Sequence, residues 1–338
     1  MNHVAIDLGG RESQIYVSAS DGTVLEQKRV ATLALKEMFR QMPHSRVIME
    51  TCSESLFVAD AARECGHDVR VVPATLVRAL GVGSRRTKND RRDAQILCEA
   101  SCRIELPSVH ISSAKARHRK TLCNSREALV SARTQLVNCV RGWMRQTGNR
   151  LRSGGVESFT KRFHDKVGDA TPEAIKRLLT MIDELCDQIA DADRQLDEEV
   201  KNDPVCQRLM SVPGVGPVTA ARFTAQLDDC ARFPDAHRVE SYLGLVPGED
   251  SSSDRKERLS ITKAGSGRVR AALVQAAWSA RRWRANDPMV RWCLEVEKRR
   301  GKRVAVVALA RKLGGILFAL WRDGGVYNPL RGAKARSS

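Results

Sequence analysis

Residues 3–30, HVAIDLGGRESQIYVSASDGTVLEQKRV, decide the fold of the first part of the chain. Three short runs in this stretch, HVAIDL, SQIYVSA and TVLEQKRV, have the apolar and β-branched content of strands. The second and third runs are separated by the turn residues Ser20, Asp21 and Gly22. This pattern predicts an antiparallel meander at the start of the chain.

Helix and strand signals alternate after the meander. The sequence predicts helices over 33–41 and 55–65, strands over 46–49 and 68–72, and helical stretches after Pro73 and Asn89. Three strands in a meander, followed by alternating helices and strands, is the order of a ribonuclease H-like α/β fold. We therefore expect an α/β domain over residues 1–112.

The strand signals stop beyond about residue 113, and helical periodicity takes their place. Segments 114–146 and 172–201 carry apolar residues at mixed three- and four-residue spacings among dense charge. They predict an antiparallel helical hairpin, or coiled-coil arm, over residues 113–202, with an exposed loop at TGNRLRSGGVES. Such an arm commonly mediates dimerisation, and packing within the chain is the alternative.

A mainly helical domain is expected over residues 203–338, beginning with a turn motif. The stretch SVPGVGPVTAARFTAQL has the pattern of a helix-hairpin-helix, with Gly214 and Gly216 in a tight turn before a helix at Pro217. Backbone N–H groups exposed at a helix start bind a DNA phosphate independently of sequence. An ordinary helix cap is an equally weighted alternative.

Charge favours a polyanionic partner. The chain has 57 Lys and Arg against 40 Asp and Glu, a formal charge of +17. Residues 255–338 contain 21 Lys and Arg and 5 Asp and Glu, so this last quarter carries +16. A solvated surface would spread its charge, whereas segregation to one end indicates nucleic-acid binding.

Cysteine usage and hydropathy indicate a cytoplasmic protein without a membrane partner. Ten cysteines are scattered without a CxxC pair, as in reduced thiols rather than disulfides or a zinc site. No uninterrupted apolar run reaches the roughly 18 residues of a membrane span. The start MNHVAIDLGG is typical of a strand rather than a signal peptide.

Four acidic residues are the candidate metal ligands. Asp7 and Glu50 end the apolar runs HVAID and RVIME, at the carboxyl ends of predicted strands, where sites in open α/β sheets form. Asp90 and Asp93 open the helical stretch NDRRDAQILCEA, and their spacing places them on one helix face. Carboxylates without histidines suit Mg²⁺ and phosphate chemistry. A turn aspartate at Asp7 and a helix cap at Asp90 are the alternatives.

Tryptophans and arginines alternate in AALVQAAWSARRWRANDPMVRWCLEVEKRRGKR. Trp278, Trp283 and Trp292 at this spacing suit a helical core, and stacking on unpaired bases is the functional alternative.

The order of Asp7, Glu50, TKNDRRDAQ and GLVPGEDSSSDRKERLSITKAGSGRVRAAL resembles the DEDD insertion-sequence transposases of the one-ten and eleven-eleven groups, over nearly the full chain. The resemblance implies an N-terminal domain like the Holliday-junction resolvase RuvC, joined by a helical arm to a C-terminal transposase domain. It also implies that Asp7, Glu50, Asp90 and Asp93 are catalytic and bind Mg²⁺, with Mn²⁺ as the alternative ion.

That family also carries a nucleophilic serine, usually followed by glycine, seven residues after the leucine of Gly-Leu-x-Pro; counted from Leu245, this is Ser252. Ser253 stands where the glycine usually does, so Ser251, Ser252 and Ser253 remain alternatives. Without the resemblance, the serine run indicates a polar loop. The cations expected to hold the DNA backbone are Arg255, Lys256, Arg258 and Lys263.

The sequence therefore predicts a nucleoid-associated transposase that cleaves and exchanges DNA strands of an insertion sequence through Ser252. The resemblance implies a structured bridge RNA as guide, and the arm predicts a homo-oligomer, either a dimer or a tetramer. A metal-dependent junction nuclease that hydrolyses DNA with water is the first rival. The others are an actin-like kinase, suggested by DLGG, and a nucleic-acid binder without activity.

Overall fold

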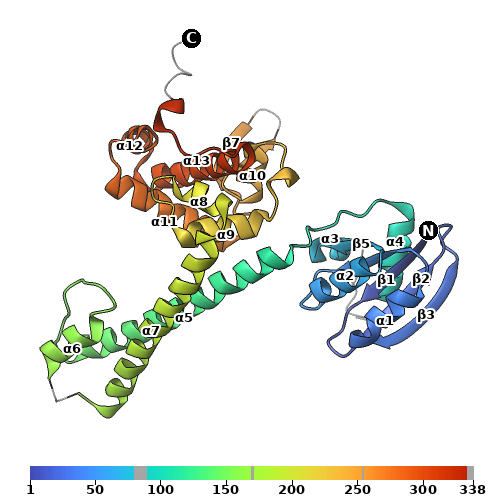
Figure 1. The fold of residues 1–338 in the computed structure, drawn as a ribbon, viewed down its shortest axis with the longest axis horizontal. Helices are drawn as coiled ribbons and strands as arrows, with labels where there is room; N and C mark the ends of the chain where they lie inside the picture. Colours follow the sequence, from blue (N-terminus) through green and yellow to red (C-terminus); the bar gives the residue numbers. More distant parts are fainter. Residues whose placement is uncertain (80–89, 169–170, 253–254, 333–338) are drawn as a thin grey trace, which may run out of the picture. The chain divides into compact units, whose positions relative to one another are not determined.

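The computed structural model describes residues 1–79, 90–168, 171–252 and 255–332 of the chain. The chain divides into two compact units, Met1–Ser112 and Ser113–Ser338. The first unit is a sheet with helices, and the second is largely helical and contains two long helices (Figure 1). The mixed α/β start and the mostly helical remainder agree with the sequence prediction.

A five-stranded sheet of order β3-β2-β1-β4-β5 organises the first unit. The first three strands form the predicted antiparallel meander, whereas β4 pairs parallel with β1 and β5 parallel with β4. Parallel neighbours need crossover connections, which α1 and α2 supply. The strands are β1 (Asn2–Asp7), β2 (Glu12–Ser18), β3 (Val24–Ala31), β4 (Ser45–Glu50) and β5 (Asp68–Val72).

Helices bury both faces of this sheet. Ile6 and Met49 pack with α1 and α2 on one face, and Ala5 and Ile48 pack with α4 on the other. Successive side chains of a strand point to opposite faces, so β1 and β4 are apolar on both sides up to their final carboxylates. The helices are α1 (Leu35–Gln41), α2 (Ser55–Glu64), α3 (Ala74–Ala79) and α4 (Asp90–Arg103), with a 3₁₀ turn at Thr32–Ala34.

Two long helices, α5 and α7, lie against each other as an antiparallel arm in the second unit (Figure 1). Ion pairs join them in opposite sequence order, Arg119 with Glu199 and Arg126 with Asp193. The shorter α6 closes one end of the arm, where Phe159 is fully buried. The bounds are α5 (Ala114–Gln146), α6 (Phe159–Val167) and α7 (Glu173–Lys201).

In the described part of the chain, helices α8 to α13 form the second core, with α13 at its centre. Leu309, Leu313 and Leu317 of α13 are fully buried. This helix is long and apolar enough to span a membrane, a test that the central helix of a globular core also passes. The bounds are α8 (Pro204–Met210), α9 (Pro217–Leu227), α10 (Ala236–Tyr242), α11 (Gly267–Trp283), α12 (Pro288–Arg300) and α13 (Lys302–Asp323), with 3₁₀ turns at Cys230–Arg232 and Pro329–Gly332.

A two-stranded antiparallel sheet interrupts these helices, so the prediction that strands stop near residue 113 is wrong. It consists of β6 (Pro247–Ser252) and β7 (Arg255–Ile261). The residues of β6, PGEDSS, are poor strand formers, so propensity gives no signal there. The strand exists through its pairing with β7.

Candidate active site

Two of the predicted carboxylates lie on adjacent strands at one edge of the first sheet. Asp7 ends β1 and Glu50 ends β4, and the residues just before them, Ile6 and Met49, are paired in register. Neighbouring strands lie about 4.8 Å apart. Because side chains alternate along a strand, Asp7 lies on the same face as Ala5, which packs against α4. On β4, Glu50 likewise lies on the same face as Ile48. The two carboxylates therefore belong to the face that α4 covers.

Helix α4 packs on this face of the sheet, with its last turns beside the start of β1. Ser101 Oγ lies 2.8 Å from His3 Nδ1, so the last turns of α4 lie beside the start of β1. From Ser101 back to Asp93 a helix rises about 12 Å, and from His3 to Asp7 a strand rises about 13 Å. Asp93 therefore lies about 12 Å along α4 from the contact with His3, and α4 begins one turn earlier, at Asp90.

The described side chains at this edge are a set of carboxylates rather than a closed metal cage. Asp7, Glu50 and Asp93 are each partly exposed and each engaged with a neighbouring group. Within the part of the chain that the structure describes, no three His, Cys, Asp or Glu residues form a group that could hold a metal ion. The side chain of Asp90 lies outside that part. Carboxylate oxygens are nevertheless the donors that a hard divalent cation binds, so the residue types fit such an ion.

The loop after Asp7 is held in a tight turn. A Cβ atom at Gly9 would lie 2.3 Å from the carbonyl oxygen of Glu12, so this close approach requires glycine. Thr32 Oγ1 donates a hydrogen bond of 2.6 Å to the Gly9 carbonyl and lies 2.8 Å from Ser13 Oγ. These contacts fix the backbone beside the Asp7 carboxylate, and they explain why a glycine stands at position 9 of DLGG.

The candidate nucleophile Ser252 lies at the far end of β6. In the hairpin register Ser252 pairs with Arg255 and Ser251 with Lys256. Arg258 pairs with Glu249 on the same ladder. The register therefore sets the serines of β6 opposite the cations of β7. The side chains of residues 249–252 and 255–258, and the whole of residues 253–254, lie outside the described part of the chain.

Backbone contacts fix the base of this hairpin. Thr262 N donates to the Val246 carbonyl at 2.9 Å, and Lys263 N donates to the Gly244 carbonyl at 3.1 Å. Gly244 has a φ of 68°, and a Cβ atom there would lie 2.1 Å from Ala264 O, so only glycine fits. Lys263 is exposed and has a φ of 56°. This predicted phosphate ligand therefore lies on the turn that follows β7 rather than on the strand itself.

The PGVG turn joins α8 to α9, and its two glycines have different surroundings. Gly214 has a φ of 84°, and a Cβ atom there would lie 2.2 Å from Ala276 O on α11. Packing therefore requires this glycine. Gly216 precedes α9, and no heavy atom lies within 4 Å of its Cβ position. A cleft of about 600 Å³ follows the turn and is also lined by Arg284. Gly216 is thus an open backbone position at a helix start.

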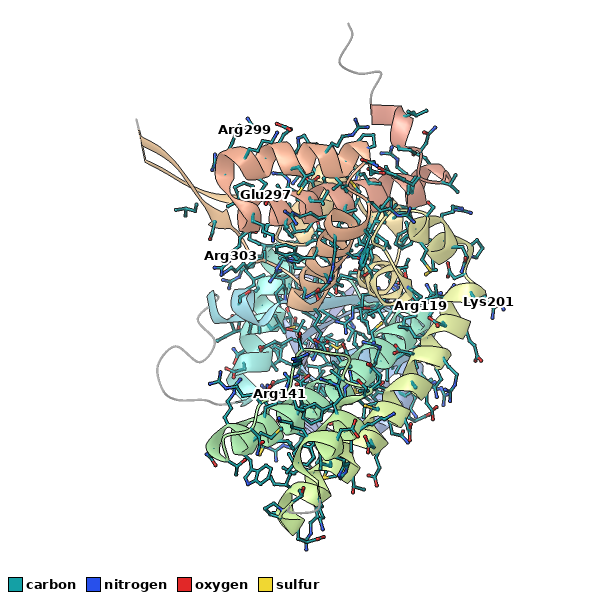
Figure 2. All side chains as sticks on the ribbon, turned by 90° about the vertical axis from the view of Figure 1, so that its left-hand side faces the viewer. Arg119, Arg141, Lys201, Glu297, Arg299 and Arg303 are labelled. Carbon is teal, nitrogen blue, oxygen red and sulfur yellow. The ribbon has the colours of Figure 1, made fainter. Side chains whose placement is uncertain are left out.

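A buried ion cluster where the arm meets α8 was missed from the sequence. Arg119 and Asp203 are only 4% and 5% exposed, and they are paired with each other. Asp203 also accepts a hydrogen bond of 2.8 Å from Lys115, and Arg119 donates to Glu199 at 2.8 Å (Arg119 is labelled in Figure 2). The available signal was an Asp directly before Pro204, the pattern of an N-cap followed by proline.

The electrostatics of Asp203 follow from these partners. Burial alone would raise the pKa of Asp203, but the hydrogen bonds from Lys115 and Arg119 hold this pKa well below its ordinary value. The carboxylate is therefore ionised when the protein is folded, and it ties the arm to the C-terminal helices.

Helices α11 to α13 carry the positive charge that the composition predicts. Residues 267–323 contain 14 Lys and Arg against 4 Asp and Glu. Glu297 is engaged by Arg281 through hydrogen bonds of 2.7 and 2.8 Å. Arg299 and Arg303 are exposed to solvent (labelled with Glu297 in Figure 2). This surface is suited to phosphate groups.

Comparison with known proteins gives matches over nearly the whole chain. Residues 4–149 match a DEDD transposase profile of the IS110 type, and residues 206–290 match the profile of the transposase IS116/IS110/IS902 family. A "Probable family 20 transposase" of Pseudomonas aeruginosa is 30% identical over 97% of this chain and 99% of its own length. The transposase for insertion sequence element IS1328 of Yersinia enterocolitica is 27% identical over 96% and 98% of the two chains. That for IS1111A of Coxiella burnetii is 28% identical over 88% and 84%.

Proposed function

Because the chain belongs to the IS116/IS110/IS902 transposase family, and is therefore an enzyme that acts on DNA, we propose that it cleaves and exchanges DNA strands of an insertion sequence through a serine nucleophile and a divalent metal ion. The observation that carries the proposal is the pair Asp7 and Glu50, which end adjacent parallel strands and share one face of the sheet. Carboxylates at the carboxyl ends of parallel strands suit metal-dependent phosphoryl chemistry.

We assign the metal to Asp7, Glu50, Asp90 and Asp93, with Mg²⁺ as the ion and Mn²⁺ as the alternative. The antiparallel meander followed by two parallel strands supports a ribonuclease H-like, RuvC-like domain. When bound, the ion supplies positive charge to the phosphoryl oxygens of the strand being cut. The role of the protein is to hold the carboxylates in place, and the burial of strands β1 and β4 supports this role.

Ser252 is the proposed nucleophile. Its Oγ forms a bond to the phosphorus of a DNA phosphodiester, and the bond from that phosphorus to the 3′ oxygen breaks. The hydroxyl proton ends on the leaving oxygen, which becomes a free 3′ hydroxyl. The phosphoserine link conserves the bond energy, so strands can be rejoined without ATP. Arg255, Lys256, Arg258 and Lys263 are the proposed ligands of the DNA backbone, supported by their places on β7 and the turn after it.

The PGVG turn, the basic C-terminal region and the helical arm are assigned roles in binding and assembly. We assign the N–H groups of the turn at Gly214 and Gly216 to a DNA phosphate, in a helix-hairpin-helix whose second helix is α9. The family resemblance assigns a structured bridge RNA as guide, and the charge of +16 over residues 255–338 supports a second polyanion. The arm of α5 and α7 is assigned to homo-oligomerisation as a dimer or tetramer. The protein would act in the cytoplasm, on DNA of the nucleoid.

Strand exchange on DNA that carries the element ends, with Mg²⁺ and the bridge RNA present, tests the proposal. Asp7→Asn and Ser252→Ala should each lower the rate about a thousandfold or more, because each removes an interaction made with the reacting phosphate. A denaturing gel should show a protein–DNA adduct for the unaltered protein and none for Ser252→Ala. Ser251→Ala, one position away on the same strand, is the matched control and should keep the adduct.

Two results would contradict parts of this proposal. An adduct that persists in Ser252→Ala and is lost in Ser251→Ala would move the nucleophile by one position. Free nicked DNA without any adduct would favour the rival, a metal-dependent nuclease that uses water.

A further inference from the structure

The last turn of α11 presents an aromatic ring to solvent. Trp283 is 72% exposed, whereas the other four tryptophans of the chain are partly buried. Leaving so large an apolar side chain in water forgoes the stabilisation that burial gives, so core packing does not account for Trp283. The guanidinium of Arg282 lies over the ring, 5.1 Å from its centroid.

Trp283 lines two clefts. One cleft has a volume of about 480 Å³ and the other about 490 Å³. A planar group stacked on the ring would therefore have room beside it for its attached chain. Besides Trp283, the clefts are lined among others by Arg284, Asp287 and Arg291 on one side and by Trp278, Arg282 and Lys302 on the other.

Three arginines next to the ring are not paired with carboxylates of the described residues. Among the described residues, Arg282, Arg284 and Arg291 form no ion pair. Asp287 lines the first cleft but caps α12, where its Oδ1 accepts hydrogen bonds of 2.9 Å from Met289 N and 2.8 Å from the Tyr327 hydroxyl. Two arginines stand against this one aspartate in the first cleft, and no described Asp or Glu lines the second, so positive charge is in excess in both clefts.

An aromatic face surrounded by uncompensated arginines fits single-stranded nucleic acid. Stacking on a protein ring needs a base face that is free, and in a duplex those faces are covered by neighbouring base pairs. Phosphates on either side of the stacked base would meet the arginines, which bind such groups through charge-assisted hydrogen bonds. A protein partner for the same surface would have to be strongly acidic as well as apolar.

We infer that Trp283, Arg282, Arg284, Arg291 and Lys302, here named the Trp283 platform, bind an unpaired base of single-stranded nucleic acid and its flanking phosphates. The ring stacks on the base, and the four cations hold the backbone. The inference rests on the proposed function, because strand exchange exposes unpaired strands, and it names a surface that would receive one.

Equilibrium binding of fluorescent oligonucleotides to the full chain, in EDTA so that no metal-dependent step occurs, tests the platform. Single strands of about 12 nucleotides, as DNA and as RNA of the same sequence, should bind Trp283→Ala roughly ten- to a hundredfold more weakly than the unaltered protein. Trp283→Phe keeps a ring and should lose much less. Phe57→Ala removes an aromatic side chain that is 53% exposed in the first unit, and it should have no effect. A duplex should bind all four proteins alike.

The two nucleic acids identify the source of the base. An equal loss for DNA and RNA supports stacking on any single strand, and a loss confined to one of them assigns the platform to that strand. Unchanged single-strand binding by a folded Trp283→Ala, or a change only in oligomeric state, would overturn the inference while leaving the proposed function intact. A full chain that binds no nucleic acid would instead contradict the proposed function.

Discussion

Two regions carry the proposed catalytic residues: the acid edge, where Asp7 and Glu50 end β1 and β4, and the serine hairpin of β6 and β7. The surrounding structure holds them in place in different ways. Asp7 and Glu50 end strands whose preceding residues, including Ile6 and Met49, are fully buried between helices on both faces of a sheet. The β6–β7 hairpin has two strands only, and Leu259 near its base is half exposed. Metal-binding carboxylates need a geometry that a packed core fixes. The position of Ser252 depends instead on the few backbone contacts at the base of the hairpin.

The largest effect on stability is expected from the support of the acid edge. Ile6→Ala removes a fully buried side chain and should lower the free energy of unfolding of the first unit by about 2–5 kcal/mol. All five tryptophans lie beyond residue 112, so their fluorescence reports on the second unit alone. In urea, the circular dichroism signal should show an early transition that the fluorescence does not.

Leu259→Ala is the matched change on the hairpin. Its half-exposed side chain contributes little, so the expected cost is below about 0.5 kcal/mol. If Leu259→Ala destabilised its unit as much as Ile6→Ala does, the hairpin would have a packed support of its own, and the contrast between the two regions would fail.

The hairpin base should respond to a single methyl group. Gly244→Ala would hold a side chain at a φ of 68° and push its Cβ to 2.1 Å from Ala264 O. The backbone conformation costs about 1–3 kcal/mol, and the clash adds to it. The tryptophan fluorescence transition should shift to lower urea, and strand exchange should fall although Ser252 is unchanged.

Gly22→Ala separates conformation from clash. Gly22 has a φ of 89° but open space around its Cβ position, in the turn between β2 and β3. It should cost about 1 kcal/mol and leave strand exchange unchanged. Equal effects at Gly22 and Gly244 would show that the contact with Ala264 is unimportant.

The sequence predicted those parts of the molecule that are determined by local patterns. Runs of apolar residues ending at Asp7 and Glu50 identify two buried strands and the carboxylates at their ends, and helical periodicity identifies α5 and α7. The prediction failed where pairing between two segments, rather than the pattern within one, decides the structure. Strand β6 forms only by pairing with β7, and the buried pair of Arg119 and Asp203 joins residues far apart in sequence. Neither leaves a periodic signal.

The residues of the candidate site differ in the same way: some could be predicted from a local pattern and others could not. Asp7 and Glu50 could be predicted as metal ligands because they are carboxylates at the ends of predicted strands. Ser252 was predicted only from the spacing of a known family, because the sequence PGEDSS has no recognisable pattern of its own. Gly214 shows a different limit. PGVG indicates a turn in either case, and only the approach of Ala276 on α11 reveals that packing requires this glycine.

The acid stability of the second unit is expected to depend on Asp203. Its pKa in the folded protein lies below the ordinary value of 3.8. As the pH falls through that value, the unfolded chain binds a proton that the folded chain does not, so stability present at neutral pH is progressively lost. Urea unfolding followed by tryptophan fluorescence should show this loss begin at about pH 5 and continue below pH 3, because the pKa of the folded protein lies lower still.

Two variants make this last prediction specific. Lys115→Met removes one hydrogen-bond donor from Asp203, so the loss on acidification should be smaller. The Asp203→Asn variant cannot take up the proton, so it should lack this part of the acid dependence. It should also be less stable at neutral pH, because Arg119 is left buried with one partner fewer. If Asp203→Asn kept the full acid dependence, other carboxylates would control it. The junction of arm and core would then be no more sensitive to acid than the rest of the unit.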